Sequence, residues 1–163
     1  MAFTSILKNI ANPRETLIIQ MDADLSHNPL AIPNFLAAAK EADLAVGSRY
    51  MPGGGILHWN FFRRLVSRGG NIYAAAILGV PYTDLTSGYK CYRADVLSQI
   101  DLEGLSSVGY NFQIETAYLA HKKGFKIAEI PIIFTERKMG GSKFSWGIIL
   151  EAFWKVMRLR FKK

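Results

Sequence analysis

The sequence predicts an α/β domain in which helices flank a mixed sheet. Residues 16–21 form an apolar run rich in β-forming side chains, and residues 44–47 form a second such run. A helical pattern lies between them, which indicates two parallel strands joined by a right-handed crossover. Half of the 163 residues are hydrophobic, so the chain is long enough and apolar enough for a single domain with its own core.

The element boundaries follow from capping residues and from glycine and proline. Asn28 and Pro29 predict the N-cap and first residue of a helix, and Gly124 predicts the end of another. Pro131 places the last predicted strand at an edge of the sheet or in an irregular position. The predicted helices are residues 3–10, 28–42, 60–78, 94–100, 111–123 and 145–161. The predicted strands lie within residues 16–21, 44–47, 84–93 and 126–134, with flexible loops at residues 53–55 and 135–143.

Composition narrows the class of function. The net charge of +7 predicts an anionic partner, such as a phosphorylated ligand or a membrane surface. The single cysteine excludes an intrachain disulfide and a cysteine-based metal site, and it fits a reducing compartment. The sequence contains no P-loop, Gly-x-Ser-x-Gly or Gly-x-Gly-x-x-Gly pattern, which disfavours the corresponding kinase-like, hydrolase and Rossmann-cofactor functions.

Two carboxylates end the first predicted strand. Asp22 and Asp24 are two residues apart, so in an extended strand their side chains point the same way. Ligands of open α/β sheets bind at the carboxyl ends of strands, and paired carboxylates suit Mg²⁺ or Mn²⁺ completed by ligand phosphates. The alternative is an ordinary polar turn at the end of a strand.

Arginines form the second polar signal. Arg49 follows the second predicted strand, while Arg63 and Ser67 share one face of a predicted helix that also carries Arg64 and Arg68. Guanidinium groups bind phosphates bidentately, so this set predicts a phosphate monoester site. The alternative for each arginine is a solvated surface charge.

The last predicted helix, residues 145–161, is amphipathic and basic. Ile149, Phe153, Val156 and Met157 share one face, with basic residues opposite. Such a helix either lies on an anionic membrane or packs on the sheet with its basic side in water. Its aromatic residues lie mainly on the apolar side, which argues against nucleic-acid binding. The sequence holds no run of about eighteen apolar residues, so no transmembrane helix is expected.

In combination, several motifs resemble one known family. They occur in order at residues 20–29, 47–50, 84–90, 109–115, 129–132 and 141–143. The chain resembles the dolichol-phosphate (polyprenol monophosphate) mannosyltransferases, which are family 2 glycosyltransferases with the Rossmann-like GT-A fold. The resemblance implies a metal-dependent, inverting transfer of mannose from GDP-mannose to a polyprenyl phosphate. It also implies a peripheral protein at the cytoplasmic face of a membrane.

The resemblance also assigns roles to residues. Asp22 and Asp24 would hold the divalent metal and the donor diphosphate, with Ser26 at a position where some members place a third ligand. Asp24 and Arg49 are the residues expected to be catalytic. The acceptor phosphate would be held by Arg49, Arg63 and Ser67, and Arg137 and Lys143 would lie on a loop that closes over the phosphates. Asp84, Lys90 and Gln113 would line the cleft.

One departure from the family pattern bears on activity. Family members carry further βα units before the Asp-x-Asp strand, which supply most of the nucleotide pocket. Residues 1–163 are therefore expected to be the C-terminal portion of a GT-A domain, either truncated or completed by a separate N-terminal half. Two alternatives follow: a related transferase with another nucleotide-sugar donor, or a non-catalytic membrane-associated remnant or split subunit.

Overall fold

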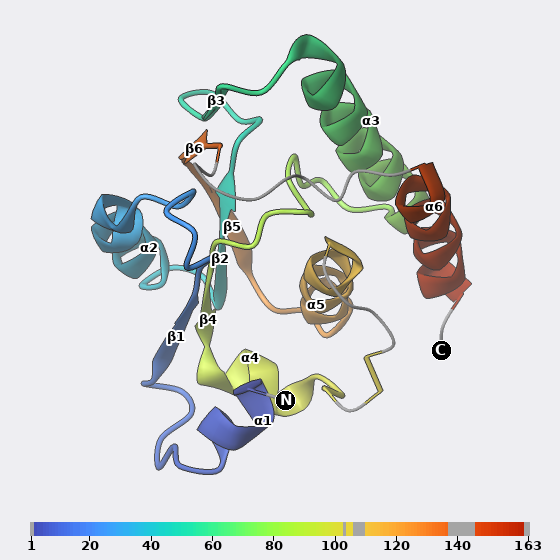
Figure 1. Cartoon of the computed structure of the whole chain (residues 1–163). Helices are drawn as coiled ribbons and strands as arrows, with labels where there is room; N and C mark the ends of the chain where they lie inside the picture. The colour runs from blue at the N-terminus through green and yellow to red at the C-terminus, as the bar shows by residue number, and fades with distance from the viewer. Residues whose placement is uncertain (1, 103, 106–109, 137–145, 162–163) are drawn as a thin grey trace.

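A mixed four-stranded sheet forms the centre of the computed structural model, which describes residues 2–102, 104–105, 110–136 and 146–161. Its strand order is β1-β4-β2-β5, with β1 Leu17–Gln20, β4 Lys90–Arg93, β2 Leu44–Ser48 and β5 Ile127–Pro131. Strand β4 is antiparallel to both of its neighbours, whereas β2 and β5 are parallel (Figure 1). Two short strands, β3 Gly55–Leu57 and β6 Ile133–Thr135, pair in a separate parallel sheet.

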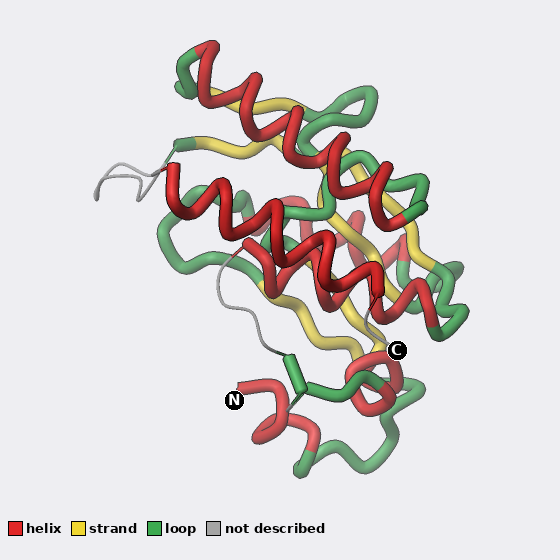
Figure 2. Tube along the Cα trace, turned by 90° about the vertical axis from the view of Figure 1, so that its right-hand side faces the viewer, coloured by secondary structure: helices red, strands yellow, loops and turns green. Residues whose placement is uncertain are grey.

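Helices cover both faces of the central sheet, so the predicted α/β class is confirmed. Helix α2 packs on one face, and the longer helices α3, α5 and α6 lie on the other (Figure 1). Viewed from that second side, the helices lie in front of the strands (Figure 2). The helices are α1 Ala2–Leu7, η1 Pro29–Ala31, α2 Ile32–Ala38, α3 Phe61–Leu78, α4 Ala94–Gln99, α5 Tyr110–Lys122 and α6 Trp146–Phe161.

The alternation of side chains along β2 divides the core into two clusters. Leu44 and Val46 point to the larger cluster, beneath α3 to α6, whereas Ala45 points to the smaller cluster around Phe35. Glycine is required next along the strand, because a Cβ on Gly47 would lie 2.9 Å from the Ile132 side chain and 3.0 Å from the Phe35 ring. The packing of α2 on the sheet therefore depends on close contact between the Phe35 ring and the backbone of Gly47.

Local capping chemistry sets several helix ends as predicted. The Asn28 side chain accepts a hydrogen bond from Leu30 N at 3.0 Å, although the first turn is a 3₁₀ helix. After α5, Gly124 has a φ of 81°, the left-handed conformation that glycine adopts most easily after a helix. Pro131 also behaves as predicted, since β5 is an edge strand.

Strands β1 and β2 run in the same direction, as predicted, although β4 lies between them and pairs with both. Three other predictions about elements are wrong. The predicted strand at residues 126–134 is two strands in different sheets, since Ile132 N bonds Ser48 O while Gly55 N bonds Ile132 O. Gly55 begins β3 rather than ending a flexible loop, and α2 ends at Ala38 rather than near residue 42.

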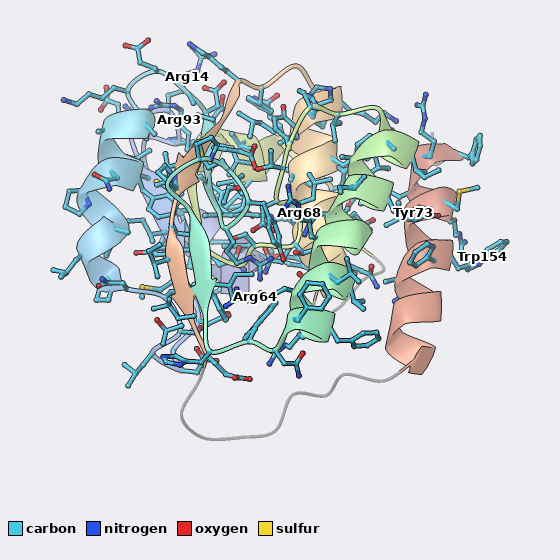
Figure 3. The ribbon with its side chains drawn as sticks, turned by 90° about the horizontal axis from the view of Figure 1, so that it is seen from above. Arg14, Arg64, Arg68, Tyr73, Arg93 and Trp154 are labelled. Atoms are coloured by element: carbon cyan, nitrogen blue, oxygen red, sulfur yellow. The ribbon has the colours of Figure 1, made fainter. Side chains whose placement is uncertain are left out.

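The buried side of α6 also differs from the predicted apolar face. Val156 and Leu159 are buried, whereas Phe153 and Met157 are exposed by more than a third. Phe153 instead stacks on Tyr73 of α3, with ring centroids 4.0 Å apart, and Trp154 points away from the protein (Figure 3). The side chains of α6 that the structure describes, from residue 152 onward, therefore pack through a narrow strip and leave large apolar groups in solvent.

The smaller core cluster gives the first prediction. Phe35 is fully buried, and its ring centroid lies 4.3 Å from that of Tyr89. Because Phe35→Ala removes this ring from the core, we expect it to lower the unfolding free energy by about 3–5 kcal/mol. Urea denaturation followed by circular dichroism measures this loss. The neighbouring Leu36 is 42% exposed, so Leu36→Ala is the matched control and should cost much less. Equal losses in the two variants would contradict the two-cluster core.

Candidate active site

A pocket lies where β1 and β2 end and β4 begins. Both strands are antiparallel to β4, so their carboxyl ends lie at the same edge of the sheet. The residues that line the pocket are Asp22, Asp24, His27, Arg49, Trp59, Arg63, Thr86, Ser87, Gly88 and Phe134. The structure thus brings the predicted carboxylates and two of the predicted arginines to one place, although they are up to 41 residues apart in the sequence.

Asp24 lies in the turn after β1, where Ser26 orients its carboxylate. Ser26 is buried, and both its backbone N–H and its hydroxyl donate to Asp24 Oδ1. Leu25, between them, has a φ of 63°, a left-handed conformation that is rare for a leucine. Ser26 stands where the resemblance places a third ligand in some family members, and in this structure its hydroxyl orients Asp24.

His27 fixes the backbone of the other carboxylate residue. Asp22 N donates to His27 Nδ1 at 3.0 Å, so this ring nitrogen carries no proton. Burial lowers the pKa of His27, which keeps the imidazole neutral at pH 7. The Asp22 side chain remains 56% exposed. The sequence alone does not assign His27 to the site; its closeness to Asp22 in the chain is the only signal.

Arg49 and Asp84 form a buried ion pair at the end of β2. Asp84 accepts hydrogen bonds from Arg49 Nε at 2.7 Å, from Nη2 at 2.8 Å and from the Arg49 backbone N at 3.0 Å. Arg49 Nη2 also donates to Thr86 Oγ1 at 2.7 Å. The carboxylate is fully buried and the arginine nearly so. Asp84 therefore acts behind the pocket wall, where it orients the guanidinium that lines the pocket.

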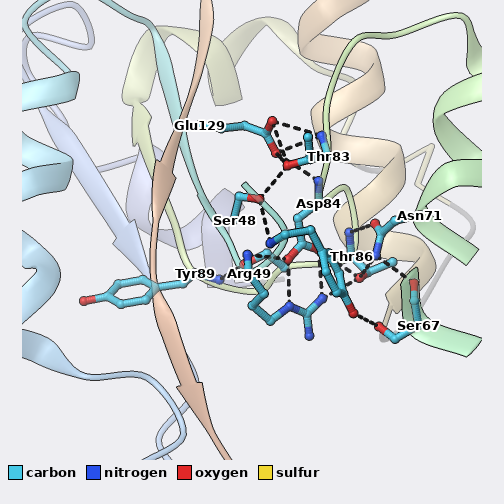
Figure 4. A network of polar contacts seen from close by, with 11 residues as sticks. Ser48, Arg49, Ser67, Asn71, Thr83, Asp84, Thr86, Tyr89 and Glu129 are labelled. Atoms are coloured by element: carbon cyan, nitrogen blue, oxygen red, sulfur yellow. Dashed lines mark hydrogen bonds and ion pairs between the residues drawn. The ribbon is translucent and has the colours of Figure 1, made fainter. Parts of the chain in front are cut away.

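Glu129 of β5 holds the segment that carries Asp84. Its carboxylate accepts hydrogen bonds from Thr83 N, Thr83 Oγ1 and Asp84 N, all at 2.9 Å (Figure 4). Thr83 Oγ1 also shares a hydrogen bond with Ser48 Oγ at 2.6 Å. A chain of contacts thus runs from the edge strand β5, through Asp84, to Arg49. The sequence did not predict this role for Glu129.

Arg63 lines the pocket from the start of α3. Its guanidinium stacks over the Trp59 ring at 3.9 Å and forms an ion pair with Glu136. Ser67, one turn further along α3, accepts a hydrogen bond from the Tyr50 hydroxyl at 2.7 Å. Ser67 is not among the described residues that line the pocket, so the structure places it beside the arginines without bringing it into the pocket.

The remaining predicted cleft residues lie deeper. Lys90 is fully buried and donates to Gln113 O at 2.6 Å, and burial lowers the pKa of its ammonium group to about 7. Gln113 lies near the pocket, because a Cβ on Gly88 would be 3.7 Å from Gln113 Nε2 and 3.4 Å from Asp22 Oδ1. Lys90 is thus an internal support for α5, and Arg137 and Lys143 lie outside the described residues.

The two aspartates are the candidate ligands for a divalent cation. In the part of the chain that the structure describes, no group of three or more His, Cys, Asp or Glu side chains could hold a metal ion. Mg²⁺ is often bound by one or two carboxylates together with phosphate and water oxygens. Asp22 and Asp24 therefore fit a cation that a phosphorylated ligand helps to coordinate.

The buried ion pair gives a second prediction. Asp84→Ala leaves the Arg49 charge buried without its carboxylate, and we expect a loss of about 3–5 kcal/mol of unfolding free energy in urea denaturation. The double change Arg49→Met with Asp84→Leu removes both charges and should cost less than Asp84→Ala alone.

Asp95 provides the matched control, because its partner Arg14 is largely exposed and the pair is 4.0 Å apart. Asp95→Ala should cost about 1 kcal/mol or less. If Asp84→Ala lowered the unfolding free energy no more than Asp95→Ala, the Arg49–Asp84 pair would not support the pocket.

Comparisons with known proteins agree with this architecture. A solved structure of glucosyl-3-phosphoglycerate synthase from Mycobacterium tuberculosis, in complex with uridine diphosphate, matches with a TM-score of 0.57 at 14% identity. The match covers 99% of this chain and 54% of that chain, and at this identity it supports the fold alone. The predicted GT-A-like fold is thereby confirmed.

Two curated proteins share more of this chain's sequence than that solved structure does. The chain is 44% identical over 142 residues to the undecaprenyl-phosphate mannosyltransferase of Micrococcus luteus, covering 87% of this chain and 58% of that protein. It is 45% identical over 142 residues to the polyprenol monophosphomannose synthase of Mycolicibacterium smegmatis, covering 86% and 54%. The chain thus spans just over half the length of these curated relatives. The model of glycosyl transferase family 2 matches residues 4–101, which is more than half of the chain, and the chain therefore belongs to this family.

Proposed function

We propose that this chain forms the cation- and acceptor-binding portion of a polyprenyl-phosphate mannosyltransferase, which transfers mannose from GDP-mannose to polyprenyl phosphate. The observation that carries the proposal is the convergence of Asp22 and Asp24 with Arg49 and Arg63 on one pocket. Both sequence relatives are named for mannosyl transfer to, or synthesis on, a polyprenyl phosphate. A pocket with paired carboxylates and paired guanidinium groups has the chemistry to hold two phosphorylated ligands.

The reaction proposed is a displacement at the sugar. An oxygen of the acceptor phosphate attacks the anomeric carbon of mannose, the bond from that carbon to the diphosphate breaks, and GDP leaves. Attack opposite the leaving group inverts the configuration. The acceptor phosphate is already an anion at neutral pH, so the protein needs no strong general base. Its task is to bring two anions together in the correct orientation.

The chain's own residues divide this task. Arg49 and Arg63 attract and orient the acceptor phosphate, and the Asp84 pair keeps the Arg49 guanidinium in one orientation. Glu136 holds Arg63 in the structure, so a bound phosphate competes with this carboxylate. Asp22 and Asp24 would hold a divalent cation, Mg²⁺ or Mn²⁺, which supplies neutralisation of the charge on the leaving diphosphate.

Mannose transfer from labelled GDP-mannose to a polyprenyl phosphate, with Mg²⁺ or Mn²⁺ present, tests the proposal. We expect Asp22→Ala with Asp24→Ala to lower the rate by at least about 100-fold while the far-ultraviolet circular dichroism stays unchanged. Glu41→Gln, an exposed acidic residue after α2, is the control and should keep the parent rate.

Other results of the same assay would overturn parts of the proposal. Transfer from a different nucleotide sugar in preference to GDP-mannose would replace the proposed donor. An unchanged rate in the folded double-aspartate variant would remove the cation role. Lack of transfer from every nucleotide sugar tested, also after addition of the N-terminal segment of a relative, would contradict an enzymatic role.

The acceptor lipid requires contact with a membrane, and we propose that α3 and α6 provide it at the cytoplasmic face. Among the described residues, no helix is both long and apolar enough to cross a bilayer. Helices α3 and α6 lie side by side and expose large apolar side chains, with Phe61 80% and Trp154 72% exposed. Arg64, Arg68 and Arg158 lie on the same two helices, and basic amphipathic helices bind anionic lipid surfaces.

Cosedimentation with vesicles that contain anionic lipid tests this surface. We expect Phe61→Ser with Trp154→Ser to weaken vesicle binding by about 10-fold or more, because each change removes a large apolar side chain from the interface. Leu30→Ser is the matched control: Leu30 is exposed too, but it belongs to η1, directly before α2, and α2 lies on the other face of the sheet (Figure 1). Equal weakening by the control would contradict the assignment of α3 and α6.

A further inference from the structure

Trp59 has an unusual position in the pocket wall. It follows His58, whose φ of 65° is in the left-handed region, and it precedes Asn60, whose side chain caps α3 by accepting from Arg63 N at 2.8 Å. Leu25 is the other non-glycine residue with a left-handed backbone among those described, and it also adjoins a pocket residue, Asp24. Backbone strain of this kind is characteristic of functional sites.

The Trp59 ring contacts both cationic groups of the pocket. The Arg63 guanidinium lies 3.9 Å from the ring centroid, and Arg49 Cζ lies 5.7 Å from it. Both distances are within the range of cation–π attraction, which is strongest for tryptophan. The Phe134 ring packs edge-on at 5.5 Å on the same residue. Trp59 is therefore the one aromatic platform that the described contacts place against both arginines.

The indole N–H of Trp59 lacks a hydrogen-bond acceptor within the described structure. The residue is only 8% exposed, and its Nε1 atom is buried with no partner. Buried polar groups are nearly always paired, and an indole nitrogen is a donor only. An acceptor atom supplied by a ligand of this pocket satisfies it, and phosphate oxygens are the acceptors that the surrounding arginines attract.

We propose that Trp59 is a ligand-binding residue of the pocket, whose ring positions Arg63 and whose indole N–H donates a hydrogen bond to an oxygen of a phosphate monoester. The inference rests on the proposed function, because that function supplies the phosphate-bearing acceptor. It adds a buried neutral donor beside the charged groups of the pocket. Since the N–H is fixed by a buried ring, it favours one position of the phosphate over others.

The experiment uses a soluble monoester, isopentenyl phosphate, so that membrane contact plays no part. Calorimetric titration compares the whole chain with Trp59→Phe, which keeps an aromatic ring for Arg63 and removes the N–H. We expect the Kd to rise about 10- to 100-fold, as for loss of a hydrogen bond to a charged group. Tyr82→Phe is the matched control, since it also removes one polar group from an aromatic ring, at a site bonded to His121 outside the pocket.

A spectroscopic measurement gives a second test that needs no change at Trp59. The chain has three tryptophans, so Trp146→Phe with Trp154→Phe leaves Trp59 as the sole source of an indole N–H resonance. Addition of isopentenyl phosphate should shift this resonance downfield and slow its exchange with water. This measurement decides the question if Trp59→Phe does not fold.

The possible results separate the inference from the function on which it rests. Binding of the monoester with an unchanged Kd in folded Trp59→Phe, or with an unmoved indole resonance, would overturn the role of Trp59 and leave the proposed function standing. Weaker binding of inorganic pyrophosphate by Trp59→Phe, with monoester binding unchanged, would assign the N–H to the donor side and overturn the monoester contact. Failure of the parent chain to bind any phosphate monoester would overturn the proposed acceptor site itself, and the Trp59 contact with it.

Discussion

The pocket depends on the buried ion pair between Arg49 and Asp84. Charges that are removed from water destabilise a fold unless they are paired and hydrogen-bonded, and here the pairing is bidentate with a further bond from the Arg49 backbone. The pair connects the end of β2 to the segment before β4, and Glu129 extends the connection to β5. The strands that position the pocket are thus joined by polar contacts at the edge where the pocket opens.

The parts of the fold that follow from local chemistry were predictable. Apolar runs marked β1 and β2, and Asn28 and Gly124 marked helix ends, because capping depends only on residues within a turn of one another. The position of β4 between β1 and β2 was not predictable, since strand order depends on contacts between residues that are distant in the chain. The break at Ile132 was missed for the same reason: its partners are Ser48 and Gly55.

In the candidate site, too, residues with a chemical signal of their own were predictable, whereas residues whose role depends on long-range contacts were not. Asp22, Asp24, Arg49 and Arg63 were identified because their side chains carry the chemistry that phosphates and cations need, and the structure brings them to one pocket. Trp59 and Phe134 were not identified, since aromatic residues carry no such signal until their contacts are known. Glu129 was missed because its role lies in bonds to Thr83 and Asp84, which only the packing of β5 against that segment reveals.

The left-handed backbone at Leu25 and His58 restricts which residues can replace them. Both side chains are exposed to solvent, so packing in the core does not impose this restriction. Glycine and asparagine enter the left-handed region readily, whereas valine, isoleucine and threonine do so at a high energetic cost. Sequence change at these two exposed positions is therefore limited by backbone conformation, and a β-branched residue at either one would disturb the geometry of the adjoining Asp24 or Trp59.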